Sequence, residues 1–208
     1  MLFKNRITAG QQLAEKLSSL KDQKNIIVLG IPRGGVVVAK EISKLLKTPL
    51  DVIVTKKIPA PSHSELALGA VGTIGEPVID EELAKKMQAD QKYLDDQIIQ
   101  LRKMVIEKEK QFRQEKSLLD LKGKTVVLVD DGIATGATVM AAIEIVRQGN
   151  PSEIIVATPV IAKDTLSKIE KLADEVIYLQ APSLFFAVGQ FYKNFEQVLD
   201  DEVKYLLK

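Results

Sequence analysis

The sequence contains no cysteine and a single histidine, His63. Without cysteine, the chain has neither a disulfide framework nor a thiolate metal site. One histidine excludes a histidine-rich zinc site and argues against a Ser-His-Asp triad. An excess of one charge is also absent, since 29 basic side chains stand against 28 acidic ones. This balance argues against nucleic acid as a partner, because nucleic-acid-binding surfaces are basic.

Long apolar runs are absent as well. No stretch approaches the roughly 20 apolar residues that a membrane-spanning helix needs. Residues 1–6 lack the hydrophobic centre of a signal peptide. We therefore expect a cytoplasmic protein that does not use a membrane. The 208 residues show no internal repeat and suffice for one domain with its own core.

The most informative stretch is TVVLVDDGIATGATV, residues 125–139. Its first five residues are typical of a strand buried on both faces, and residues 139–147 are typical of an amphipathic helix. Between them lie two aspartates and a loop of small residues. Backbone N–H groups of such a loop, and of the helix's first turn, can converge on a phosphate. The predicted phosphate loop consists of Gly132, Ile133, Ala134, Thr135, Gly136, Ala137 and Thr138.

The two aspartates, Asp130 and Asp131, have a different predicted role. Ionised carboxylates only accept hydrogen bonds, so they suit sugar hydroxyls or a hard metal ion rather than the phosphate itself. A glycine-rich turn can be a purely structural connection, and an acidic pair can simply be solvated. Here, however, all the elements occur together in one order. The loop is neither a Walker A loop nor a GxGxxG dinucleotide loop.

A second strand–loop–helix unit precedes this one. Residues 25–30 predict a buried strand and residues 36–46 a helix, and the loop between them contains Arg33, Gly34 and Gly35. A positive side chain beside two glycine N–H groups suits a further phosphate or a pyrophosphate. Such a turn on its own could also be structural.

Two lysines, Lys56 and Lys57, follow the next predicted strand, residues 50–55. Ligands of an open parallel sheet bind outside the carboxyl ends of its strands. Both lysines are therefore expected to point into the same crevice as the two loops. The alternative is a solvated strand end, since surface lysines often have no role.

Strand and helix patterns alternate along the chain. This alternation predicts an α/β fold with a doubly wound, mainly parallel five-stranded sheet flanked by helices. A flexible loop or ribbon, a helical insertion and a small hood are expected in addition. We expect one domain over residues 1–208, with the insertion at about 80–117 and the hood or tail at about 182–208. The five strands are expected at residues 25–30, 50–55, 125–129, 153–158 and 175–179.

The connecting segments have patterns of their own. Residues 58–68 contain two prolines and predict an exposed, mobile loop. Residues 69–79 predict a ribbon that turns near residues 75–77. Asp80 is a reasonable N-cap for the first of one or two helices in the polar segment that ends at residue 116. Further helices are expected at residues 7–20 with Thr8 as N-cap, at 163–172 and at 196–207.

The tail is rich in aromatic residues. Phe185, Phe186, Tyr192 and Phe195 could stack on a flat base or pack within the hood. The sequence pattern does not distinguish these two interpretations.

The run VVLVDDGIATGATV resembles the phosphoribosyl-pyrophosphate (PRPP) motif of type I phosphoribosyltransferases. That motif is a hydrophobic strand, two acidic residues and a TG-x-T loop. The resemblance implies transfer of ribose 5-phosphate from PRPP to a nitrogenous base, a purine or a pyrimidine, with release of pyrophosphate, as in nucleotide salvage. It also implies Mg²⁺ as cofactor and a flexible loop over the reacting centre. Separately, apolar residues at near-heptad spacing between residues 87 and 112 suggest helices that pack on the sheet or on a partner subunit, so a homodimer is possible.

The same resemblance implies a role for each loop. The phosphate loop would bind the 5-phosphate of PRPP. The pyrophosphate would bind at Arg33, Gly34 and Gly35, helped by Lys56 or Lys57 and by Mg²⁺. Arg6 is left as a contact at the rim of the site.

Asp130 and Asp131 are expected at the ribose hydroxyls, directly or through metal-bound water, and are the predicted metal ligands. Hypoxanthine-guanine members of the family carry an acidic residue before the Thr-Gly of the motif, where this sequence has Ala134, as adenine members do. The 6-oxopurine interpretation therefore loses support. Glu65, the one carboxylate of the predicted mobile loop, becomes the candidate for a base-directed carboxylate. The predicted catalytic residues are Asp130, Asp131, Glu65 and Lys57.

Two other hypotheses are open. A regulator on the same scaffold could sense PRPP or a nucleotide without turning it over. A phosphatase or kinase-like enzyme could use the acidic pair for Mg²⁺, but this leaves the loop at Arg33 without a function. Release of pyrophosphate from PRPP would separate the transferase from both.

Overall fold

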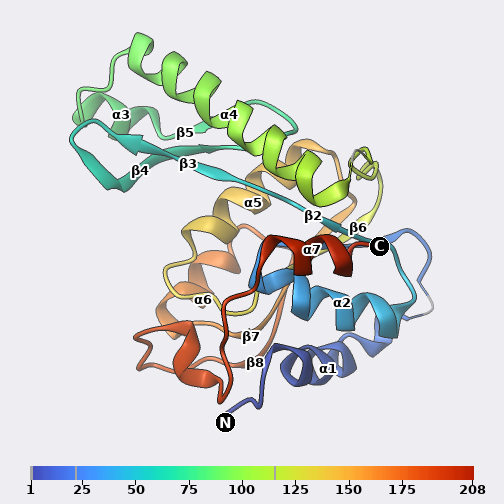
Figure 1. Ribbon diagram of the computed structural model, residues 1–208. Coiled ribbons are helices and arrows are strands. Elements are labelled where there is room, and N and C mark those ends of the chain that lie inside the picture. The colour runs from blue at the N-terminus through green and yellow to red at the C-terminus, as the bar shows by residue number, and fades with distance from the viewer. Residues whose placement is uncertain (1, 22, 115) are drawn as a thin grey trace.

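The structure is a computed structural model that describes residues 2–21, 23–114 and 116–208, with only the backbone of Glu65. In this part of the chain, five strands form a parallel sheet in the order β2-β1-β6-β7-β8 (Figure 1). Helices cover both faces, so the predicted α/β class and doubly wound sheet are confirmed. The strands are β1 (Ile26–Gly30), β2 (Leu50–Val52), β6 (Thr125–Val129), β7 (Glu153–Val160) and β8 (Glu175–Gln180).

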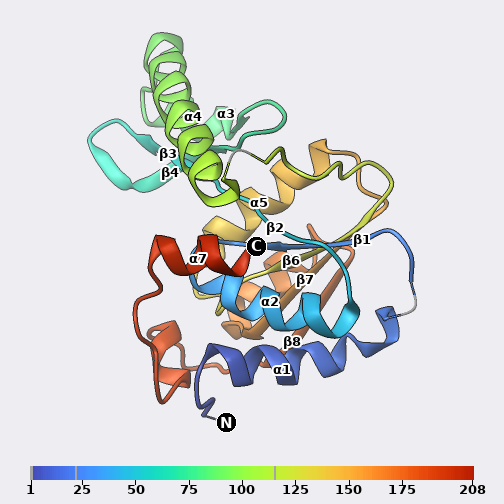
Figure 2. The same ribbon diagram turned by 45° about the vertical axis from the view of Figure 1, so that its right-hand side comes forward.

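The central strands are buried on both faces because successive apolar side chains point to opposite sides. In β1, Ile27 and Leu29 pack with α5 and α6, whereas Ile26 and Val28 pack with α1 and α2. Figure 2 shows α5 on one side of the strands and the pair α1 and α2 on the other. The four covering helices are α1 (Arg6–Lys16), α2 (Gly34–Leu46), α5 (Ala137–Gln148) and α6 (Lys163–Ile169).

The order of the strands reverses between β1 and β6. Along the chain, β1 is followed by its neighbour β2 on one side, whereas β6 lies on the other side. Gly30, the last residue of β1, is in register with Val129, the last residue of β6. The loops that leave these two strands therefore start side by side and lead to helices on opposite faces. In doubly wound folds, ligands bind in the crevice at this point.

The segment predicted as a mobile loop, residues 58–68, is instead part of an antiparallel hairpin. The hairpin consists of β3 (Lys56–Ala60) and β4 (His63–Val71). The predicted strand 50–55 is shorter than expected, because the chain leaves the parallel sheet after Val52 to enter the hairpin. Our prediction of an exposed loop is therefore wrong.

Burial explains why this segment forms strands. The side chains of Ile58 and Leu68 are fully buried and pack with apolar residues of α4 (Gln91–Arg113). The prolines are compatible with pairing, since Pro59 lies at a register shift of the ladder and Pro61 lies in the turn.

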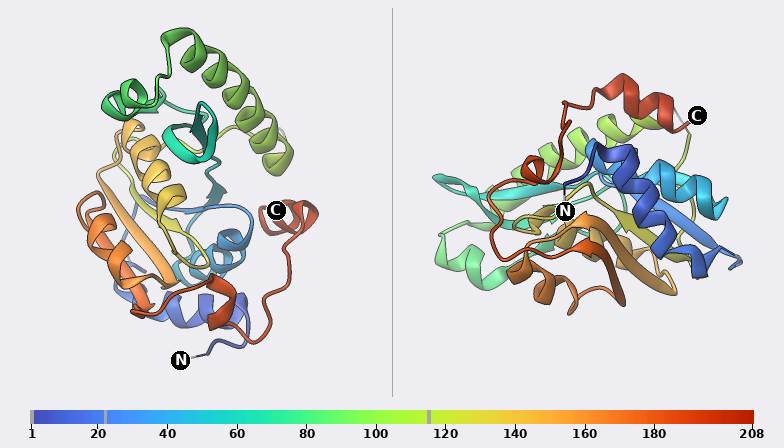
Figure 3. Two further views of the ribbon diagram at one scale, coloured as in Figure 1. Left: turned by 90° about the vertical axis from the view of Figure 1, so that its left-hand side faces the viewer. Right: turned by 90° about the horizontal axis from the view of Figure 1, so that it is seen from below.

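The short strand β5 (Val78–Ile79) and the helix α3 (Glu81–Lys86) complete the inserted unit, which stands at one end of the molecule (Figures 1 and 3). The antiparallel pairing of β4 with β5 confirms the predicted ribbon. Asp80 caps α3 as predicted, since its Oδ1 accepts the Leu83 N–H at 2.9 Å. The polar segment forms two helices, α3 and α4, as the sequence pattern allowed.

The N-terminal helix differs from the prediction at both ends. Asn5 is the N-cap, because its Oδ1 accepts the Thr8 N–H at 2.9 Å while Thr8 Oγ1 accepts the Asn5 N–H at 3.2 Å. The assignment of Thr8 as N-cap is therefore wrong, since Thr8 is the reciprocal partner in the capping box. The α-helix ends at Lys16, and a 3₁₀ turn, η1 (Ser18–Leu20), follows.

The C-terminal segment returns to the N-terminus (Figure 3). It contains a 3₁₀ turn, η2 (Val188–Phe191), and a last helix, α7 (Asp200–Leu206), which is shorter than predicted. The Phe3 N–H donates to the Phe191 carbonyl at 2.8 Å, and the Phe3 and Tyr192 rings lie 5.4 Å apart. None of the helices described here has both the length and the apolar character needed to cross a membrane.

Candidate active site

The two predicted ligand loops are in direct contact. The Ile31 N–H donates to the Val129 carbonyl at 2.8 Å, so the loops leave their strands side by side. A Cβ atom at Gly34 would lie 1.9 Å from Asp131 Oδ2, and one at Gly35 would lie 2.6 Å from the Val129 carbonyl oxygen. Neither position has room for a side chain. The glycines therefore allow the loop at Arg33 to lie against the acidic pair.

On one side, the phosphate loop is bonded to the end of β7 and to α6. Ile133 forms a bridge with Ile161, and Thr165 Oγ1 donates to the Ala134 carbonyl at 2.6 Å. Gly136 is the N-cap of α5 and has a φ of +78°, a conformation that favours glycine. The loop is thus held in shape before any ligand binds.

The other side of this loop is exposed to solvent. Thr135, Ala137 and Thr138 are exposed. The first amides of α5 have no acceptor within the helix, as at any helix start. Two hydroxyls and these amides therefore face a region that suits an anion, as the sequence motif predicts.

The acidic pair is held by its neighbours. Asp130 Oδ1 accepts the Asp131 N–H at 2.8 Å. Burial and the adjacent Asp131 carboxylate raise the pKa of Asp130 well above its ordinary value. The two carboxyl groups thus have different environments, because Asp131 has a cationic partner close by.

That partner is Arg6, at the start of α1. Its Nε lies 2.6 Å from Asp131 Oδ2, and its guanidinium lies 3.8 Å from the centroid of the Phe195 ring. Tyr192 Oη donates to the Asp131 backbone carbonyl at 2.6 Å, and burial raises the pKa of this tyrosine. Among the tail aromatics, Tyr192 and Phe195 thus pack around the acidic pair, whereas Phe186 is 86% exposed.

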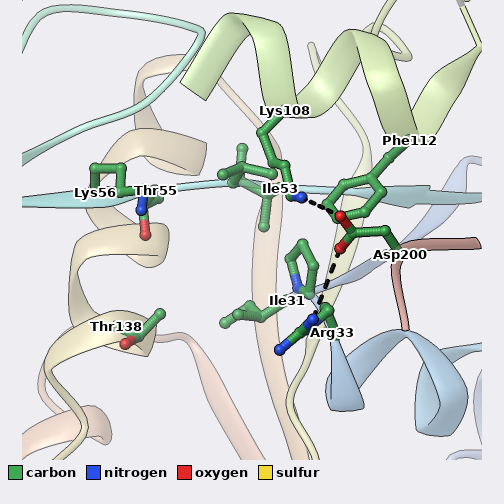
Figure 4. Close-up of a pocket in the computed structure, with 11 residues that line it drawn as sticks. Ile31, Arg33, Ile53, Thr55, Lys56, Lys108, Phe112, Thr138 and Asp200 are labelled. Atoms are coloured by element: carbon green, nitrogen blue, oxygen red, sulfur yellow. Dashed lines mark hydrogen bonds and ion pairs between the residues drawn. The ribbon is translucent and has the colours of Figure 1, made fainter. Parts of the chain in front are cut away.

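A cavity of about 270 Å³ is lined by residues 31–33 of the first loop and by Thr138, the last residue of the phosphate loop (Figure 4). Arg33 and Thr138 are on opposite sides of it, and Lys56 lines it from the hairpin. A neighbouring cavity of about 740 Å³ shares Lys56 and Thr138 and extends between α5 and the inserted sheet. Lys57 lines only this second cavity.

The structure therefore brings together most of the predicted site. The loop at Arg33, the acidic pair, the phosphate loop and Lys56 all meet at the carboxyl ends of β1 and β6. It does not bring Lys57 into the cavity beside Arg33. Glu65 lies in β4, and its side chain is outside the part of the structure that is described.

Two charged residues of the cavity were missed by sequence reasoning, Lys108 of α4 and Asp200 of α7. Lys108 is one of many charged residues in a segment interpreted as a solvated face. Asp200 lies in the tail. No local pattern distinguishes either residue from its charged neighbours, because their positions depend on how the insertion and the tail pack on the core.

The donor set near the cavity can be compared with the needs of Mg²⁺. This ion is usually held by one or two carboxylates, with water and substrate oxygens completing an octahedron. The described residues contain no cluster of three or more metal-ligating side chains. Asp130 and Asp131 are adjacent, and one oxygen of Asp131 is engaged by Arg6. This pair fits a Mg²⁺ ion that is held largely by its substrate.

Comparisons of the sequence and of the structure with known proteins agree on one family. The model of the phosphoribosyl transferase domain family matches residues 2–195. Proteins from two strains of Mycobacterium tuberculosis, each named "Putative phosphoribosyl transferase", are 42% identical over 206 residues, which is 97% of this chain and 45% of theirs. The chain thus spans less than half of those relatives. The crystal structure of TT1426 from Thermus thermophilus is 40% identical and superimposes with a TM-score of 0.89, covering 100% of this chain and 98% of that one.

Proposed function

The chain belongs to the phosphoribosyl transferase domain family, and on this premise we propose that it transfers ribose 5-phosphate from PRPP to a nitrogenous base, with release of pyrophosphate. The acceptor is a purine or pyrimidine base, and the reaction is of the salvage type. PRPP carries an anionic group at each end of one ribose. A protein that uses it needs two anion sites separated by about the width of a sugar.

The observation that carries this proposal is the contact between the two loops. The loop at Arg33 touches Asp131, and the phosphate loop begins at the next residue. A single cavity has Arg33 on one side and Thr138 on the other. One PRPP molecule can therefore place its pyrophosphate at Arg33 and its 5-phosphate at the start of α5.

The chemistry needs little acid–base help from the protein. The bond from the ribose C1 to pyrophosphate breaks toward a positively charged, oxocarbenium-like sugar, and the leaving oxygens gain negative charge. Arg33 and Lys56 line the cavity where this charge develops, so they can stabilise the leaving group. Holding both ends of PRPP also orients C1 toward the acceptor nitrogen.

The acidic pair suits the ribose hydroxyls between the two anion sites. Asp130 supplies carboxyl oxygens that can accept hydrogen bonds there, and Arg6 orients Asp131. When bound, Mg²⁺ would neutralise the charge of the pyrophosphate, and Asp130 and Asp131 are the residues that would hold it. The carboxylates then act as binding and orienting groups.

The site offers one clue to the acceptor. The Ala134 side chain has no polar group that could form a hydrogen bond with a 6-oxopurine, and its carbonyl already accepts from Thr165 Oγ1. An adenine-like acceptor fits this position better than hypoxanthine or guanine. Glu65 keeps its predicted role as a base-directed carboxylate.

The test is a titration followed by a turnover assay. Calorimetry with PRPP and Mg²⁺ should show binding, and a panel of purine and pyrimidine bases should include one that releases pyrophosphate. Binding of PRPP without turnover against every base would support the alternative, a regulator that senses PRPP or a nucleotide. Absence of PRPP binding would contradict the proposal.

A further inference from the structure

Three charged side chains from distant parts of the chain meet at one side of the 270 Å³ cavity. Arg33 comes from the loop after β1, Lys108 from the inserted helix α4 and Asp200 from the first turn of α7. Arg33 Nη1 lies 3.9 Å from Asp200 Oδ1, and Lys108 Nζ contacts Asp200 Oδ2 (Figure 4). One carboxylate thus lies between two cations beside the proposed pyrophosphate loop.

The carboxylate of Asp200 is incompletely paired. Its Oδ1 is buried, yet no described residue donates a hydrogen bond to it, and Arg33 at 3.9 Å is too distant to do so. A buried oxygen without a donor has lost its hydration without replacing it. The cations, in contrast, are accessible, since the side chains of Arg33 and Lys108 are 40% and 36% exposed.

We infer that Arg33 and Lys108 together bind the leaving pyrophosphate, and that Asp200 is an internal occupant of this anion site which the ligand displaces. The identity of the ligand rests on the proposed function. A pyrophosphate carries more charge and more acceptor oxygens than one carboxylate, so it can satisfy both cations at once. While the site is empty, the negative charge of Asp200 offsets the repulsion between the two cations.

The position of Lys108 is fixed by the next turn of its own helix. Glu109 Oε1 accepts the Val54 N–H at 2.9 Å, and Arg113 Nε lies 2.7 Å from Asp51 Oδ1. The charged groups of Asp51, Glu109 and Arg113 are all buried. They tie α4 to the edge strand of the core sheet. A lysine on this helix is therefore held at the cavity rather than carried by a mobile insertion.

The side chain of Asp200 is held by fewer hydrogen bonds than that of Arg113 in α4, since its carboxylate contacts Lys108 and lies 3.9 Å from Arg33. Residues 196–199 before Asp200 form no regular element. Rotation of its side chain away from Arg33 requires no change in the core sheet.

The inference can be tested with inorganic pyrophosphate as the calorimetric probe, with and without Mg²⁺. Removing the carboxylate charge in Asp200→Asn should tighten pyrophosphate binding by about 3- to 10-fold, and Lys108→Gln should weaken it by a similar factor. Lys108→Arg should restore most of the affinity. Binding of ribose 5-phosphate, which uses the other loop, should be unchanged in all three variants.

Asp201→Asn is the matched control. Asp201 is the next residue of the same helix, but its side chain is 89% exposed and pairs with Lys204, away from the cavity. Its replacement should leave pyrophosphate affinity unchanged. Thermal melting of every variant checks that the fold is kept.

Other results would overturn the inference. Unchanged affinity in Asp200→Asn would show that Asp200 does not compete with the ligand, and weaker affinity only with Mg²⁺ would assign it to the metal instead. Unchanged affinity in Lys108→Gln would remove Lys108 from the site. These outcomes leave PRPP binding, and hence the proposed function, intact. Failure of the wild-type protein to bind either PRPP or pyrophosphate would end both proposals.

Discussion

Arg6 and Asp131 form an ion pair with 2.6 Å between Arg6 Nε and Asp131 Oδ2, although they are 125 residues apart in the sequence. The pair joins the N-terminal helix to the acidic pair of the proposed ribose site. Both side chains are only about an eighth exposed, at 12% and 13%. Asp131 is thereby oriented before a substrate arrives.

Removal of Arg6 should destabilise the fold. In Arg6→Gln, Asp131 would be left mostly buried without its cation beside Asp130, which should lower the unfolding free energy by about 1–3 kcal/mol. Urea unfolding at neutral pH measures this change. Lys44→Gln is the control, because Lys44 is 60% exposed in its pair with Glu41 and should cost no more than about 0.5 kcal/mol. Equal losses in the two variants would show that the Arg6 pair contributes nothing beyond a surface contact.

Asp130→Asn should have opposite effects on stability and on PRPP affinity. Because burial and Asp131 raise the pKa of Asp130 in the folded state, the folded protein holds this proton more tightly than the unfolded chain. Its contribution to stability is therefore present below the ordinary pKa of aspartate and is lost as pH rises through the raised value. Above the ordinary pKa of aspartate, Asp130 therefore makes folding less favourable than a neutral side chain of the same shape would.

Two measurements follow for this variant. Asparagine can still accept the Asp131 N–H through Oδ1, so the melting temperature at pH 7 should rise. Above the ordinary pKa of aspartate, the melting temperature of the variant should also vary less with pH than that of the wild type. Affinity for PRPP should fall, since a negative acceptor at the ribose is lost. A lower melting temperature at pH 7 would contradict the electrostatic cost assigned to Asp130.

Arg33→Ala should impair binding of the pyrophosphate end of PRPP selectively. Affinity for PRPP and for pyrophosphate should drop by about 10- to 100-fold, as expected for the loss of a charge-assisted contact, while affinity for ribose 5-phosphate changes little. Arg147→Ala is the control, because Arg147 is also 40% exposed but pairs with Asp174 away from both cavities. Equal losses for PRPP and ribose 5-phosphate would count against the pyrophosphate assignment.

The sequence predicted the fold best where the signals are local. The run from Thr125 to Val129 is a buried strand as expected, and Asp80 caps its helix, because apolar patterning and capping act over a few residues. Thr8 shows the limit of such signals. Asn5 and Thr8 both have capping side chains, and only the path of the chain decides which of them is the cap.

The hairpin at residues 56–71 was missed because its signals conflict. Two prolines, two serines and charged residues outweigh the alternation of Ile58, Ala60 and Leu68 when the segment is considered alone. The structure resolves the conflict through long-range burial, since these apolar side chains pack on α4, which lies further along the chain. Tertiary packing can override local propensity in this way.

The sequence by itself determined the two strand–loop–helix units whose loops we propose as phosphate sites, because each is a continuous run in which strand, glycines and helix start follow one another. Only the tertiary structure decided which charges surround those loops. The contact of Lys108 with Asp200 joins residues 92 positions apart, and the contact of Arg6 with Asp131 joins residues 125 positions apart. Such partners meet because the sheet order, the insertion and the tail bring them together. The residues next to a charged side chain in the sequence do not indicate which distant charge it will contact.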